Sequence, residues 1–126
     1  MFDLKRRTVT LANSGLPYPI RCSGESVAQI ELPGVPLGSF AGSAYDELSF
    51  DLSAGDLFVF CTDGVFEAND ALGREFGAER LVDVVRQHCR ASARDVVNAV
   101  FSAVEEFRGE TPANDDMTAV AVRIRD

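Results

Sequence analysis

The stretch LFVFCTDGVFE, residues 57–67, decides how this sequence is interpreted. Residues 57–61 are apolar at every position, as in an interior β-strand that is covered on both faces. Asp63 and Gly64 follow almost at once. Asp-Gly is a common turn dipeptide, but a carboxylate at the end of a strand is also a candidate metal ligand. The stretch alone leaves both interpretations open.

A second group of acids stands before the last strand that the sequence predicts. Residues 118–124 alternate between apolar and other side chains, and Asp115 and Asp116 come shortly before them. If this strand pairs antiparallel with residues 57–61, these acids meet Asp63 at one edge of the sheet. A hard divalent cation, Mg²⁺ or Mn²⁺, would relieve the repulsion between such carboxylates. Gly64 fits this site, because a residue without Cβ lets backbone and ion approach closely, although ordinary loop chemistry also explains these residues.

The rest of the pattern predicts one α+β domain over residues 1–126, with antiparallel β-sheet layers and two covering helices. Short turns between consecutive strands favour antiparallel pairing, and helices segregated in sequence favour a layer on one sheet face. Ser92 is a candidate N-cap for the second helix, which Gly109 ends. Further strands are predicted at 8–12, 27–32 and 48–52, and the first helix at 78–89.

Composition excludes some classes of protein. The 126 residues include 12 basic and 20 acidic side chains, a formal net charge of -8, and the only basic cluster is residues 5–7. Proteins that bind duplex nucleic acid show a basic face, so we expect no nucleic-acid partner. No apolar run reaches the ~18 residues of a membrane span, and no signal peptide is evident. We therefore expect a cytoplasmic protein without a membrane partner.

The cysteines and the single histidine indicate structural roles. Cys22, Cys61 and Cys89 form no CxxC pair, so the sequence suggests neither a zinc site nor a disulfide framework. Cys61 and Cys89 are predicted as small core residues, which agrees with a reducing cytoplasm. His88 lies on the apolar stripe of a predicted helix and is interpreted as a structural residue rather than a general base.

Two further segments were candidates for chemistry and are interpreted as loops. Residues 34–38, GVPLG, lack the lysine and hydroxyl of a phosphate-binding loop and are predicted to form a packed turn. Glu67, Asn69 and Asp70 are predicted to lie in a solvated loop rather than to bind a metal.

The order of several segments is more specific than any one of them. The segments are NSGLPYP (13–19), GVPLG (34–38), LSAGDLFVFCTDGVFEA (52–68), EFGAERL (75–81) and NDDMT (114–118). Together they resemble the C-terminal half of the metal-dependent protein serine/threonine phosphatases of the PPM type, and most of all the bacterial branch that includes the stage II sporulation protein E phosphatase.

The resemblance implies part of an α/β/β/α sandwich and a binuclear Mn²⁺ or Mg²⁺ centre that activates water for attack on phosphoserine or phosphothreonine. Matched motif to motif, Asp63 and Asp115 fall on metal-ligand positions, with Asp116 and the backbone of Gly64 as less certain contributors. No catalytic residue beyond the metal-activated water is implied. The implied substrate is a phosphorylated regulatory protein such as an anti-anti-sigma factor.

The sequence departs from the family pattern at two places. Leu16 stands where the family motif has a histidine, and no GDxxGHG segment, which supplies the bridging aspartate, is present. We therefore expect little or no phosphatase activity from this chain alone. The alternative is a non-catalytic phosphatase-like module for binding or oligomerisation, and a sheet face left apolar by the missing half predicts a homodimer or larger assembly.

Overall fold

The computed structural model describes residues 1–12, 17–31, 47–112 and 115–125. The predicted turn at 34–38, and the part of the NSGLPYP motif at 13–16, lie outside these residues.

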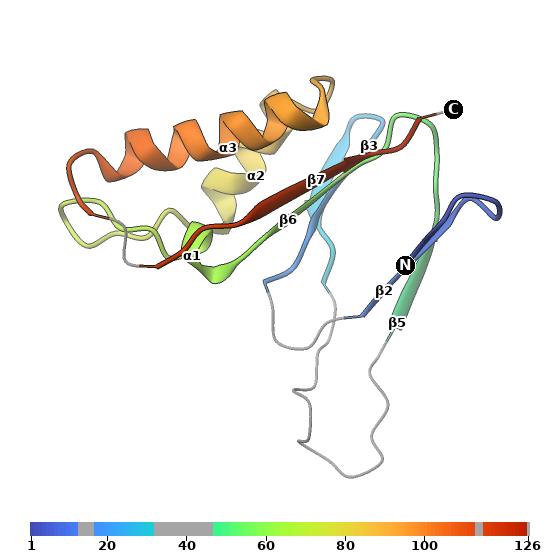
Figure 1. The fold of residues 1–126 in the computed structure, drawn as a ribbon, viewed down its shortest axis with the longest axis horizontal. Coiled ribbons are helices and arrows are strands. Elements are labelled where there is room, and N and C mark those ends of the chain that lie inside the picture. Colours follow the sequence, from blue (N-terminus) through green and yellow to red (C-terminus); the bar gives the residue numbers. More distant parts are fainter. Residues whose placement is uncertain (13–16, 32–46, 113–114, 126) are drawn as a thin grey trace, which may run out of the picture.

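Two antiparallel sheets face each other, and a helical layer covers the larger one (Figure 1). The smaller sheet has the order β1-β2-β5 and the larger one the order β4-β3-β6-β7. In chain order the elements are β1 (Phe2–Asp3), β2 (Thr8–Ala12), β3 (Ile20–Ser23), β4 (Ser26–Gln29), β5 (Glu47–Asp51), β6 (Leu57–Cys61), α1 (Asp63–Phe66), α2 (Gly77–Gln87), α3 (Ala93–Arg108) and β7 (Ala119–Arg123).

The strand β6 contributes to both hydrophobic cores. Leu57 and Val59 lie in the core beneath α2 and α3, whereas Phe58 lies in the core between the two sheets. All three side chains are at most 1% exposed. This confirms that a strand apolar at every position is covered on both faces.

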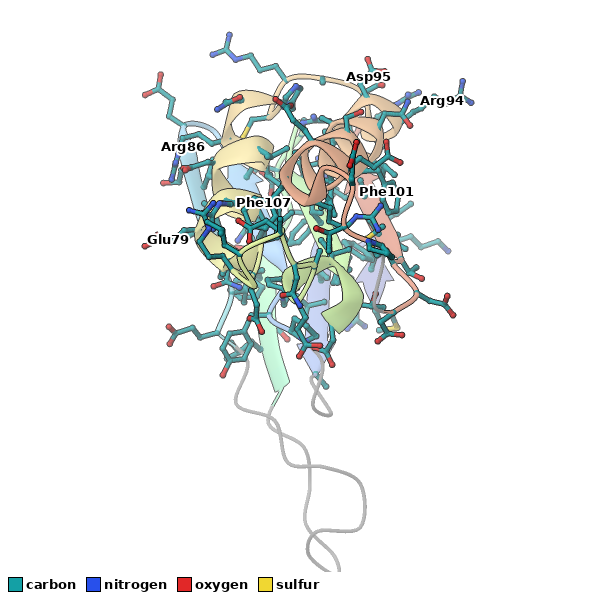
Figure 2. All side chains as sticks on the ribbon, turned by 90° about the vertical axis from the view of Figure 1, so that its left-hand side faces the viewer. Glu79, Arg86, Arg94, Asp95, Phe101 and Phe107 are labelled. Carbon is teal, nitrogen blue, oxygen red and sulfur yellow. The ribbon has the colours of Figure 1, made fainter. Side chains whose placement is uncertain are left out.

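The long helices form where the sequence predicts them. The Ser92 hydroxyl accepts a hydrogen bond from the Asp95 backbone N–H at 3.1 Å, so Ser92 is the N-cap of α3. Gly109, with a φ of 60°, ends this helix, and Gly77, with a φ of 77°, begins α2. Glu79 and Arg86 of α2 and Arg94 of α3 are exposed to solvent on the outer side of the molecule (Figure 2). The α+β class, the antiparallel sheets and both predicted helices are thus confirmed.

One element was not predicted from the sequence, and one prediction was wrong. The residues after β6 form a one-turn helix, α1. Asp70 is not in a solvated loop: it is buried, and its Oδ1 accepts hydrogen bonds from the backbone N–H groups of Leu72 and Arg74, both at 2.9 Å. The Arg74 guanidinium adds an ion pair at 2.6 Å. These hydrogen bonds and the ion pair satisfy the Asp70 carboxylate in place of water.

The outward face of the smaller sheet is polar. Val9, Leu11 and Phe50 pack toward the larger sheet, so the alternation of the strands turns Thr10 and Ser49 outward. The two hydroxyls lie 3.0 Å apart. This face therefore offers little apolar surface for self-association, and the homodimer stays a prediction.

No helix in the described part of the chain is long and apolar enough to cross a membrane.

Candidate metal site at one edge of the larger sheet

The pairing of β6 with β7 brings the predicted site residues to one edge. The two strands are antiparallel, and Cys61 lies opposite Ala119 at the last step of the ladder. The contact continues beyond it, because the Thr62 N–H donates to the Thr118 carbonyl at 3.0 Å. The Thr118 N–H in turn donates to the Thr62 hydroxyl at 3.0 Å. Asp63 and the segment before Thr118 therefore lie at the same edge, as the sequence predicted.

Gly64 is required by the close approach of Asp116. A Cβ atom built on Gly64 would lie 2.1 Å from the Asp116 carbonyl oxygen and 2.9 Å from its carbonyl carbon. No side chain fits at such distances, so any larger residue would push the 116 backbone away from α1. Because Gly64 has no side chain, the segment that carries Asp116 can pack directly against α1.

The carboxylate-bearing residues at this edge are exposed to solvent. Asp63 is the first residue of α1, and Asp115 and Asp116 lie before β7. The Asp115 Oδ1 accepts a hydrogen bond from the Asp116 N–H at 2.7 Å, which orients the turn into the strand. The structure brings the predicted residues to one edge, but it groups no three His, Cys, Asp or Glu side chains around a common point within residues 1–12, 17–31, 47–112 and 115–125.

The chemistry of this donor set fits a hard divalent cation. Mg²⁺ prefers oxygen ligands, keeps several waters and is commonly held by only one or two carboxylates. Asp63 and Asp115 offer such carboxylates in contact with water, and the Asp116 carbonyl lies directly against Gly64. The described residues can supply part of a metal site, with the remaining ligands coming from water or from other residues.

Comparison with known proteins identifies the family of this chain. The family model for Stage II sporulation protein E (SpoIIE) matches residues 1–125. The chain belongs to the SpoIIE family. None of the curated protein sequences matches it significantly.

Solved structures share the fold of this SpoIIE-family chain. The SiaA-PP2C domain of Pseudomonas aeruginosa is 25% identical with a TM-score of 0.80, over 95% of this chain and 48% of that one. A structure of the PP2C phosphatase domain and part of the regulatory domain of SpoIIE from Bacillus subtilis is 23% identical with a TM-score of 0.75, over 98% and 36%. The RsbU and RsbW domains of Rv1364c from Mycobacterium tuberculosis are 27% identical with a TM-score of 0.75, over 98% and 34%. The chain therefore spans half or less of the length of these structures.

A second carboxylate beside β6 has a role that the sequence did not reveal. Asp56, directly before the strand, is 1% exposed. Its oxygens accept hydrogen bonds from the Arg21 guanidinium at 2.9 Å, the Ser23 hydroxyl at 2.8 Å and the Ser53 N–H at 3.0 Å. Burial alone would raise the pKa of Asp56, but these bonds and the Arg21 charge hold it below its usual 3.8.

Arg21 connects this buried acid to the smaller sheet. Its guanidinium also donates to the Asp51 carbonyl of β5 at 2.8 Å and lies over the rings of Phe50 and Phe58. Asp56 is therefore the anchor of a link between the sheets in this SpoIIE-family chain. Hydrogen-bond partners 33 and 35 residues away in sequence gave no local signal for it.

The single histidine has the structural surroundings that the sequence predicted. One ring nitrogen, Nδ1, lies 2.8 Å from the Val84 carbonyl one turn earlier in the chain, and the residue ends α2. His88 is thus bound within the helical layer, away from the edge that carries Asp63.

Proposed function

We propose that this chain provides the C-terminal half of a metal-dependent protein serine/threonine phosphatase, in which Asp63 and Asp115 help to hold Mn²⁺ or Mg²⁺. The observation that carries the proposal is the junction of the β6 and β7 ends, where the Asp116 backbone packs against Gly64. Membership of the SpoIIE family and the fold shared with PP2C phosphatase domains support it. One structure of the SpoIIE phosphatase domain from Bacillus subtilis was presoaked with Mn, which agrees with the choice of metal.

The residues of this chain have defined parts in that activity. Asp63 and Asp115 supply carboxylate oxygens, and Asp116 and the Gly64 backbone are further contributors. The Thr62–Thr118 hydrogen bonds hold the two segments at a fixed spacing. A bound divalent cation would supply an activated water and neutralise charge on the phosphoryl oxygens. The exposed edge lets a protein-bound phosphoserine or phosphothreonine approach.

We further propose that the substrate is a phosphorylated regulatory protein, such as an anti-anti-sigma factor, in the cytoplasm. The similarity to the RsbU domain of Rv1364c and to SpoIIE, described as a cell-fate determinant, supports a signalling role. The alternative function is a non-catalytic module that binds such a protein without turnover. The lack of a three-ligand cluster among the described residues favours this alternative for the chain in isolation.

The test is complementation with the missing half. The chain would be fused behind the part of the SiaA-PP2C domain that it does not cover, and Mn²⁺-dependent phosphate release from a phosphoserine peptide would be measured. We expect the isolated chain to be inactive and the fusion to be active, with activity lost in Asp63→Asn and Asp115→Asn but retained in Asp83→Asn, an exposed acid of α2. The assignment of Asp63 and Asp115 would be refuted by a fusion whose activity both variants leave unchanged. Robust turnover by the isolated chain, with or without these variants, would also refute it.

A further inference from the structure

Two cysteines distant in sequence meet where α2 packs on the sheet. Cys22 lies in β3 and is 2% exposed, while Cys89 follows the end of α2 and is partly buried. The helix α2 packs against β3, and both cysteines belong to the core on that side. A cavity of ≈ 450 Å³ is lined by both of them.

The two thiols differ in their surroundings. Burial, and after it the adjacent Cys89 thiol, raises the pKa of Cys22 to about 12, so Cys22 remains protonated. Cys89 is the more exposed of the two, and the cavity that reaches it is also lined by Arg90 and Arg123, with Glu25 as an acidic neighbour. The Cys89 sulfur is therefore the one that an oxidant in solvent can reach through this cavity.

We propose that Cys22 and Cys89 are a peroxide-sensitive pair that forms an intramolecular disulfide between β3 and the end of α2. The Cys89 thiol loses its proton, its sulfur attacks one oxygen of hydrogen peroxide, the O–O bond breaks, and a sulfenic acid forms while the departing hydroxide takes up that proton and leaves as water. The Cys22 thiol then passes its proton to the departing hydroxyl group as its sulfur attacks the sulfenic sulfur, so the S–S bond forms, the S–O bond breaks and a second water leaves. The two thiols lose two electrons in total, and the peroxide gains them.

The disulfide would fasten the helical layer to the sheet. It closes a long loop that contains β6, α1 and α2, and the cross-linking of a long loop restricts the unfolded chain. Cys22 pairs with Leu57 at the start of β6, whereas Asp63 follows the end of that strand. The pair is thus separate from the candidate metal site, and the inference does not depend on the proposed function.

Peptide mapping under non-reducing conditions tests the pair directly. The folded protein would be treated with hydrogen peroxide, alkylated, digested and analysed by mass spectrometry. We expect a peptide linked through Cys22 and Cys89, with Cys61 still free. The melting temperature should rise by about 5 °C and return to its starting value after reduction.

Single variants give the matched controls. Cys61→Ser, which changes the third cysteine, should still form the link, whereas Cys89→Ser should form none and show no rise in melting temperature. The proposal is overturned if the folded wild-type protein keeps Cys22 and Cys89 as thiols, or if oxidation yields only sulfinic acid, links to Cys61 or disulfides between chains. Because these outcomes are read on the wild type, the test does not depend on whether Cys22→Ser folds.

Discussion

The strand β6 has one aspartate directly before it and another shortly after it, and the two have opposite surroundings. Asp56 is 1% exposed and accepts hydrogen bonds from an arginine, a serine hydroxyl and a backbone N–H. Asp63 is exposed at the start of α1. A carboxylate whose oxygens are occupied by the protein stabilises the fold, while one that faces water is free to bind a ligand. The surroundings of each acid, rather than its position beside an apolar strand, indicate its role.

The largest effect on stability should come from Asp56→Asn. The change removes the charge that Arg21 pairs with and leaves a partly buried guanidinium without its counter-ion. We expect the free energy of unfolding to fall by about 3 kcal/mol, measured by urea denaturation. Asp83→Asn, which breaks an exposed ion pair with Arg86, is the control and should cost at most about 0.5 kcal/mol. Equal losses in the two variants would show that Asp56 does not anchor the sheets.

Gly64→Ala should have the next largest effect. The new Cβ would overlap the Asp116 carbonyl, so the two segments must separate, at a cost of about 2 kcal/mol. Gly73→Ala is the matched control: its φ of 80° strains any side chain, but no atom lies within 4 Å of the new Cβ. We expect about 1 kcal/mol there. A smaller loss in Gly64→Ala than in Gly73→Ala would contradict the close approach.

The dependence of stability on pH gives a third, smaller effect. The pKa of Asp56 is below 3.8 in the folded protein, so its ionisation stabilises the fold above that pH, and the stabilisation is lost as the pH falls through the folded pKa. Burial raises the pKa of Asp70, but hydrogen bonds from Arg74 and Leu72 outweigh it, so the folded pKa of Asp70 is also below its ordinary value. Urea denaturation below pH 4 should therefore show a shallower loss of stability in Asp56→Asn than in the wild type. Parallel curves would exclude this role for Asp56.

The smallest effect on stability is expected at the exposed edge. Asp63→Asn and Asp115→Asn change side chains that face solvent, so the free energy of unfolding should change by less than about 0.5 kcal/mol. Thermal denaturation without added metal is the measurement. A larger loss of stability would show that Asp63 and Asp115 stabilise the fold, as Asp56 does.

Local patterns in the sequence predicted the sheet and helix layers and the edge of the sheet that carries Asp63, but they did not predict every element. The apolar strand, the alternation before the C-terminus and the Ser92 cap are each visible within a few residues, and the two strands suggested the β6–β7 pairing. The helix α1 has only four residues, too few for a helical period to appear. The burial of Asp56 depends on Arg21 and Ser23 in β3, and pairing across strands gives no signal along the chain. The burial of Asp70 could not be predicted, because the backbone N–H groups that bind its carboxylate occur in any polar loop.

The most direct test of the account is whether Mn²⁺ binds at the edge that carries Asp63 and Asp115. Paramagnetic broadening of amide NMR signals during a Mn²⁺ titration detects even weak binding and locates it. We predict that the signals of Asp63, Gly64 and Asp116 broaden first, and that Asp63→Asn and Asp115→Asn each weaken this effect at least about tenfold, while Asp83→Asn does not. Broadening that begins elsewhere, or that persists unchanged in both site variants, would contradict the assignment of this edge as a metal site.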